Sequence, residues 1–137
     1  MELELTKKEY RRLLDMVYIG NWVLNSMRGE DRFSDYDAVE SLLFSKAREV
    51  DMAVLADEAD GEVIPSKAFV EGGIHEAIID YENAVFFDIL AEELARRDMD
   101  DPPIDESNYA ELTSRIEAYI TEFEQHGIDN ILVDTDR

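Results

Sequence analysis

The chain has 137 residues, of which 34 are Asp or Glu and 13 are Lys or Arg, so its formal charge at pH 7 is −21. This charge repels nucleic-acid phosphates and anionic lipid surfaces, and it attracts cations and basic protein surfaces. We therefore expect no direct binding to nucleic acid or to membranes. Cysteine is absent, which excludes disulfides, thiolate nucleophiles and cysteine-based zinc sites.

The length and composition predict one folded domain over residues 1–137. Apolar residues make up 45% of the chain, and they recur in periodic runs that disordered acidic tails lack. The start MELELTKKEY has no apolar signal core, and no apolar stretch approaches the roughly 18 uncharged residues that span a bilayer. We therefore expect a cytoplasmic protein.

The first half of the chain carries helix signals. Thr6 and Glu9 form a capping-box pattern, after which apolar residues recur at helical spacing until Gly29. Asp37 and Glu40 are placed to cap and charge the start of a second helix. The segment DEADGEVIPS that follows this helix is acidic and turn-rich, and it predicts a mobile connection.

The second half continues the helical pattern. A short helical turn at 66–71 is expected to end at Gly72 and Gly73, and the long apolar run after it closes with two arginines that suit a helix C-terminus. Two consecutive prolines then interrupt the helix, and Asn108 is expected to cap the last one. Residues 131–133 predict a short strand or a docked extension.

The fold class that these signals predict is an all-α, single-domain bundle of about four main helices plus a short extra helix. The main helices are expected at about 6–28, 37–55, 74–97 and 108–126, with acidic loops at 57–65 and 98–107.

Two segments, EYRRLLDMVYIGNWVLNSMR and YENAVFFDILAEELARRDMD, resemble parts of a group of small bacterial helical proteins that has no known function. The resemblance implies a helical, bacterial and cytoplasmic protein. It brings no activity, ligand or functional residue to this chain.

The familiar metal and hydrolase motifs are missing from the sequence. Neither acidic loop has the ligand spacing and the glycine of a calcium-binding EF-hand. No Glu-x-x-His, Glu-x-x-Glu or Gly-x-Ser-x-Gly pattern occurs, which argues against di-iron, helical pyrophosphohydrolase and serine hydrolase sites. We therefore predict no metal and no cofactor, while the question of catalysis stays open with a bias against it.

The helix at 74–97 has apolar residues on two faces. The bulkier face predicts the main core and consists of Ile79, Phe86, Phe87, Leu90 and Leu94. Asp88 and Glu92 lie on the other, otherwise apolar face, and Arg96 follows one turn later. Both carboxylates either reach water beside small alanines or line a polar pocket between helices.

The first helix has a similar irregularity, because Asn21, Asn25 and Arg28 continue its apolar stripe. Buried amides need hydrogen-bond partners, so the stripe either emerges into water or joins an inter-helix network. Gly20 would suit close packing of another helix. The candidate polar cluster consists of Asn21, Asn25, Arg28, Asp88, Glu92 and Arg96.

The function that we predict is a non-catalytic interaction, adaptor or inhibitor module that binds a basic partner. Residues 98–137 hold 12 acidic residues against two basic ones, so this part is the expected binding surface. The two-faced helix at 74–97 predicts a homodimer. The alternative is a small helical enzyme that binds a ligand or a divalent metal in the polar cluster, where carboxylate and amide oxygens suit magnesium, calcium or manganese.

Overall fold

The computed structural model describes residues 1–136 and is mostly helical, which confirms the predicted fold class. Contacts divide the chain into two compact units, Met1–Ile78 and Ile79–Arg137. Nothing in the composition of 74–97 marks this division. None of the helices within residues 1–136 has the length and apolarity that a membrane span needs.

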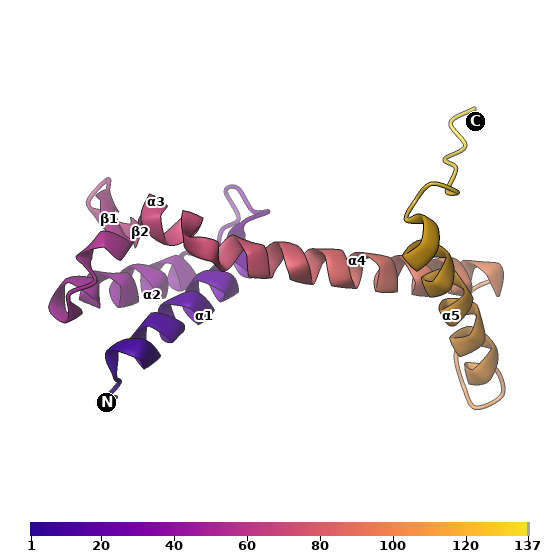
Figure 1. Ribbon diagram of the computed structural model, residues 1–137, viewed down its shortest axis with the longest axis horizontal. Helices are drawn as coiled ribbons and strands as arrows, with labels where there is room; N and C mark the ends of the chain where they lie inside the picture. Colours follow the sequence, from indigo (N-terminus) through magenta and orange to yellow (C-terminus); the bar gives the residue numbers. More distant parts are fainter. Residues whose placement is uncertain (137) are drawn as a thin grey trace. The chain divides into compact units, whose positions relative to one another are not determined.

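The first unit contains α1, α2, a two-stranded hairpin, α3 and the first residues of α4, and the second contains the rest of α4 and α5 (Figure 1). The main elements are α1 Lys7–Asn25, α2 Ser34–Ser45, β1 Ala56–Ala59, β2 Glu62–Pro65, α3 Lys67–Phe69, α4 His75–Asp98 and α5 Tyr109–His126.

Helix α1 begins with the predicted capping box. The Glu9 amide donates to Thr6 Oγ1 at 3.2 Å, and the Thr6 amide donates to the Glu9 carboxylate at 2.8 Å. These bonds satisfy two backbone donors that a helix start otherwise leaves free. The helix ends at Asn25, before the predicted end at 28.

The second helix was predicted at 37–55, but the observed helix both starts and ends earlier in the chain. Helix α2 starts at Ser34, without a side-chain cap, and stops at Ser45. Two short 3₁₀ turns follow, Lys46–Val50 and Ala53–Leu55. Between them Asp51 has a φ of 60°, in the left-handed region, which an α-helix cannot continue through.

The predicted loop at 57–65 is largely a β-hairpin. Strands β1 and β2 pair antiparallel, with Asp57 opposite Ile64. The two residues between them, Asp60 and Gly61, have φ values of 52° and 80°, as a type I′ turn requires. Ala56 of β1 and Val63 of β2 pack against the core of the first unit, so one residue of each strand anchors the hairpin.

Four residues form the buried core of the first unit, and they come from α1, α2 and α3: Tyr10, Leu14, Phe44 and Phe69. The rings of Phe44 and Phe69 meet edge to face at 4.9 Å between centroids, a favoured aromatic geometry. The Tyr10 hydroxyl donates to the Leu43 carbonyl at 2.6 Å. This core holds α1 and α2 together and fixes the polar groups at their adjoining ends.

Two glycines of the first unit differ in whether the backbone requires glycine. Gly73 lies in the π-helical segment Val70–Ile74 and has a φ of 110°, which side-chain-bearing residues rarely adopt. Gly20 lies within helical α1, and a Cβ built on it meets no atom within 4 Å. Close packing at Gly20, which its position in the sequence suggested, is therefore not present.

We expect Gly73→Ala to destabilise the protein by about 1–3 kcal/mol because the backbone there disfavours a side chain. Gly20→Ala is expected to stabilise it by up to about 1 kcal/mol, since alanine is the better helix former. Urea unfolding followed by circular dichroism measures both. Both substitutions replace glycine by alanine, so each is the control for the other. Changes of the same sign in the free energy of unfolding would contradict the different backbone requirements that we assign to Gly73 and Gly20.

The second unit is built on the packing of α5 against α4. The rings of Phe87 and Phe123 lie 5.3 Å apart, and Ala91 and Ala95 of α4 are fully buried. The Tyr119 hydroxyl donates to the Asp98 carboxylate, and this bond is the largest cause of a lowered pKa at Asp98. Figure 1 shows α5 at the C-terminal end of α4.

Several local predictions for the second half are wrong. Ile79 and Phe86 are 52% and 51% exposed, so only part of the predicted main core of α4 is buried. Asn108 does occupy the predicted N-cap position of α5, but its side chain makes no capping bond, and its Nδ2 donates instead to the Pro103 carbonyl at 3.0 Å. Residues 131–133 form no strand, and Leu132 is 93% exposed.

Candidate functional site

A buried amide network joins the end of α1 to the start of α2. Asn25 Nδ2 donates to Asn21 Oδ1 at 2.7 Å, and Asn21 Nδ2 donates to Asp37 Oδ1 at 3.0 Å. Asn25 also binds the segment between the helices, because its Oδ1 accepts the Phe33 amide at 2.8 Å. Both asparagines are buried, so of the two alternatives the inter-helix network is the one that forms, and its acid is Asp37 rather than Asp88 or Glu92.

Arg32 completes this network at the surface. Its Nη2 and Nε donate to the two carboxylate oxygens of Asp37 at 2.8 and 2.9 Å, a fork geometry that guanidinium groups favour. The hydrogen bond from Arg32 is the largest cause of the lowered pKa of Asp37. The positive charge of Arg32 is therefore matched by Asp37.

A pocket of about 230 Å³ opens beside the network, and we call it the polar pocket. Its walls come from both α1 and α2 and from the segment between them. The lining residues are Tyr18, Asn21, Trp22, Ser26, Arg32 and Glu40.

The chemistry of the polar pocket centres on Glu40. This carboxylate forms no ion pair within residues 1–136. Burial is the largest cause of its raised pKa, and the charge of Asp37 acts in the same direction. The Asn21 amide and the charge of Arg32, which also lines the polar pocket, act in the opposite direction. Arg32 forms its ion pair with Asp37, so Glu40 is a half-buried acid beside a guanidinium that is already paired.

The aromatic wall of the polar pocket is backed by His75. Tyr18 Oη and His75 Nε2 share a hydrogen bond at 2.5 Å, and the rings of Trp22 and His75 meet edge to face at 6.1 Å. Burial and the negative charge of Glu40 raise the pKa of Tyr18. His75 therefore orients the tyrosine that faces the acid.

Arg28, the third predicted residue of the first helix, lies beyond the end of α1 and outside this network. Its Nη1 donates to Asp31 at 3.0 Å, its Nε donates to the Leu24 carbonyl at 2.8 Å, and its guanidinium stacks over the Phe33 ring. These contacts give Arg28 a local role in the turn before α2.

The other three predicted residues belong to the second unit. Glu92 is exposed and accepts a hydrogen bond from Arg96 Nε at 3.0 Å, one turn away. Asp88 is also exposed and lines an open pocket of about 320 Å³ with Phe87, Phe123 and Glu124. The residues of the predicted cluster thus fall into two groups, one in each unit.

No three His, Asp or Glu side chains within residues 1–136 gather in a way that could hold a metal ion. The alternative prediction of a divalent-metal site therefore has no candidate ligand set in the part of the chain that the structure describes.

The second unit exposes a mixed apolar and acidic face on α4, which we call the α4 stripe. Its members follow one another at alternating intervals of three and four residues, so they share one side of the helix. The α4 stripe consists of Ile79, Glu82, Phe86, Ile89 and Glu93. Its three apolar side chains are each more than half exposed.

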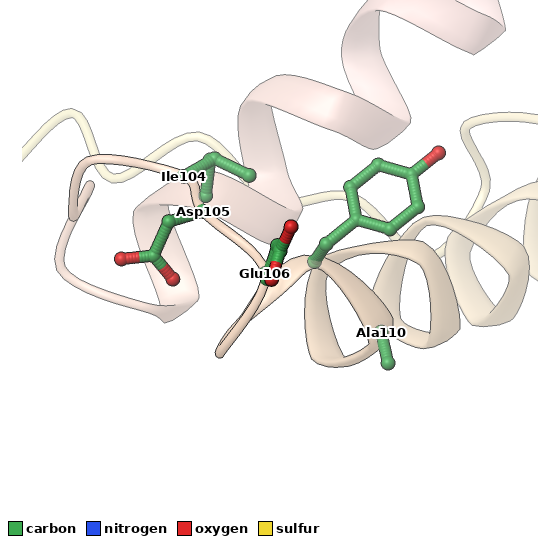
Figure 2. A pocket seen from close by; sticks show the side chains of 5 residues that line it. Ile104, Asp105, Glu106 and Ala110 are labelled. Carbon is green, nitrogen blue, oxygen red and sulfur yellow. The ribbon is translucent and has the colours of Figure 1, made fainter.

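A shallow, mostly apolar hollow of about 470 Å³ lies at the start of α5 in the same unit. Figure 2 shows Ile104, Asp105 and Glu106 in the segment before this helix and Ala110 in its first turn. Asp105 is held locally, since its carboxylate accepts the Ser107 amide at 2.8 Å. Asp105 and Glu106 beside this hollow are both exposed at the surface of the second unit.

Of the residues that line the polar pocket, the predicted cluster contained only Asn21. It lacked Tyr18, Trp22, Ser26, Arg32 and Glu40, and also the neighbouring Asp37 and His75. The spacing of Asp37 and Glu40 could have shown that both acids lie on one side of α2. Both acids face α1 because of the way in which α1 packs on α2, and no local sequence pattern encodes this packing.

Comparison with known proteins found no matching family model, no similar curated protein and no similar solved structure.

Proposed function

We propose that the protein is a non-catalytic, acidic interaction module that binds a basic partner protein through its second unit, Ile79–Arg137. Charge supports this proposal most directly. The second unit has 17 acidic and four basic residues, whereas the first has 17 and nine. Within residues 79–136, all three arginines already pair with acids of the same unit, namely Glu92, Asp98 and Glu111.

The surplus carboxylates of the second unit are therefore free to attract cations from a partner. Among them, Glu82 and Glu93 of the α4 stripe form no ion pair within residues 79–136. Both flank exposed apolar side chains on the same face of α4. A partner that supplies lysines or arginines beside apolar residues would match this surface in charge and in polarity.

The partner segment that fits the α4 stripe best is an amphipathic basic helix. Helices pack along stripes with spacing of three and four residues, which is the spacing of the α4 stripe. The apolar side of such a helix would cover Ile79, Phe86 and Ile89, and its basic residues would meet Glu82 and Glu93.

A second copy of the chain, the predicted homodimer, matches the α4 stripe less well. It would bring another chain with a formal charge of −21 to this surface, and like charges repel. Burial of Glu82 and Glu93 would then lack compensating cations. We therefore favour the basic partner over the homodimer as the occupant of this face.

Binding of a helical peptide with leucines on one face and lysines on the other tests this function. We expect affinity to fall steeply as salt rises, because the attraction is electrostatic. The double variant Phe86→Ala, Ile89→Ala is expected to bind at least tenfold more weakly, since central apolar contacts dominate affinity. Fluorescence anisotropy of the labelled peptide measures both effects.

The matched control is Leu132→Ala with Val133→Ala, which removes two exposed apolar side chains from the C-terminal tail. Equal losses in the two double variants would refute the α4 stripe as the binding surface. Affinity that does not change with salt would refute the electrostatic proposal itself. Light scattering that shows a dimer only when Phe86 and Ile89 are intact would assign this face to self-association.

A further inference from the structure

We propose that the polar pocket of the first unit binds a small primary alkylammonium ion, with Glu40 as its counter-ion. This site lies in a different unit from the acidic surface described above and does not depend on the proposed protein partner.

The charges around the polar pocket select a monovalent cation. The lining holds two charged groups, Arg32 and Glu40. Two hydrogen bonds join Arg32 to Asp37, so these two charges offset each other, while Glu40 forms no ion pair in residues 1–136. A half-buried carboxylate is stabilised when a cation pairs with it. An anion would meet Glu40 and the strongly negative chain, so the polar pocket disfavours it.

The aromatic walls select an organic cation. Trp22 and Tyr18 line the polar pocket beside Glu40, and the hydrogen bond to His75 fixes the tyrosine. Aromatic faces attract ammonium groups and also cover alkyl carbon. A divalent metal would find a single free carboxylate there, and no group of three ligands occurs in residues 1–136.

The volume of the polar pocket suits a ligand of a few carbon atoms. Its volume of about 230 Å³ equals that of roughly eight water molecules at ~30 Å³ each. The five non-hydrogen atoms of n-butylammonium fit this space and leave room for ordered water. The lining thus provides one carboxylate for the ammonium group and two rings for its chain, while the charge of Arg32 is held by Asp37.

Fluorescence of Trp22, the single tryptophan of the chain, gives a local measure of binding. We expect a saturable change with n-butylammonium chloride at about 0.5 M NaCl, where salt screens the exposed acids. The neutral analogue n-butanol and the anion n-butyrate are expected to give no saturable change. Equal responses to butanol and butylammonium would overturn the assignment of a cation site.

Glu40→Gln keeps the shape of the side chain and removes its charge, so we expect affinity for butylammonium to fall at least tenfold. Glu62→Gln is the matched control, because Glu62 is an exposed acid of β2 that forms no ion pair within residues 1–136. Equal affinities of the two variants would refute the role of Glu40.

A second measurement covers the case in which the Glu40 variant fails to fold. Amide and indole NMR shifts of the unaltered protein during the titration should change around Trp22 and Glu40, and changes scattered over the acidic surface would refute the site. Nα-acetyl-lysine amide carries the same ammonium group. Tighter binding of this compound than of butylammonium would indicate that the natural ligand is a lysine side chain of a protein. Weaker binding would indicate that the natural ligand is a free amine.

Discussion

Asn25→Ala is expected to lower the free energy of unfolding by about 2–4 kcal/mol, since each buried polar group left unpaired costs about 1–3 kcal/mol. Asn25 is only 1% exposed. Its side chain accepts the Phe33 amide at 2.8 Å and donates to the Phe33 carbonyl at 3.1 Å and to Asn21 at 2.7 Å. Alanine removes all three bonds and leaves a small cavity.

Urea unfolding monitored by Trp22 fluorescence would measure this loss, because Trp22 lies on the same helix. Ser26→Ala is the control, since Ser26 is the exposed neighbour of Asn25 and we expect a change within about 0.5 kcal/mol. Equal stabilities of the two variants would show that the amide network contributes nothing to the fold.

Phe69→Ala is expected to destabilise the first unit by about 3–5 kcal/mol, the usual cost of truncating a buried phenylalanine. The ring is fully buried and lies 4.9 Å from the Phe44 ring and 5.3 Å from the Tyr18 ring. The Arg11 guanidinium covers it at 4.6 Å. Because α3 has only three residues, this side chain is its main attachment to α1 and α2.

Leu42→Ala serves as the control in the same unit, because Leu42 is 58% exposed on α2. We expect its cost to stay below about 1 kcal/mol, as for most surface substitutions. Urea unfolding monitored by circular dichroism compares the two variants. A Leu42 variant as unstable as the Phe69 variant would mean that the core of this unit is misassigned.

Local signals explain the parts of the fold that the sequence predicted well. The capping box at Thr6 and Glu9 needs only residues within one turn, and it forms as expected. A loop was predicted in place of the hairpin, although Asp60 and Gly61 are a strong turn pair. Strand β1 reads Ala-Asp-Glu-Ala, which has little strand propensity, so packing of the hairpin on the core had to supply the stability.

The candidate site was predictable only in part, for a similar reason. Asn21 and Asn25 interrupt an apolar stripe, and this pattern correctly indicated a need for polar partners. The partner is Asp37 of α2, and its identity depends on which helix packs against α1. Helix α4 has apolar residues on two faces, so periodicity could not decide whether Asp88 and Glu92 are buried.

The bond from the Phe33 amide to Asn25 has a consequence for the segment between α1 and α2. This segment is fastened at its far end to the interior of the first unit, one residue before α2 starts. The placement of α2 is therefore set by that attachment and by its apolar contacts. Within residues 27–31, Met27 and Glu30 are exposed and make no side-chain hydrogen bond or ion pair in the described part of the chain, so we expect these two positions to vary without moving the helix that follows.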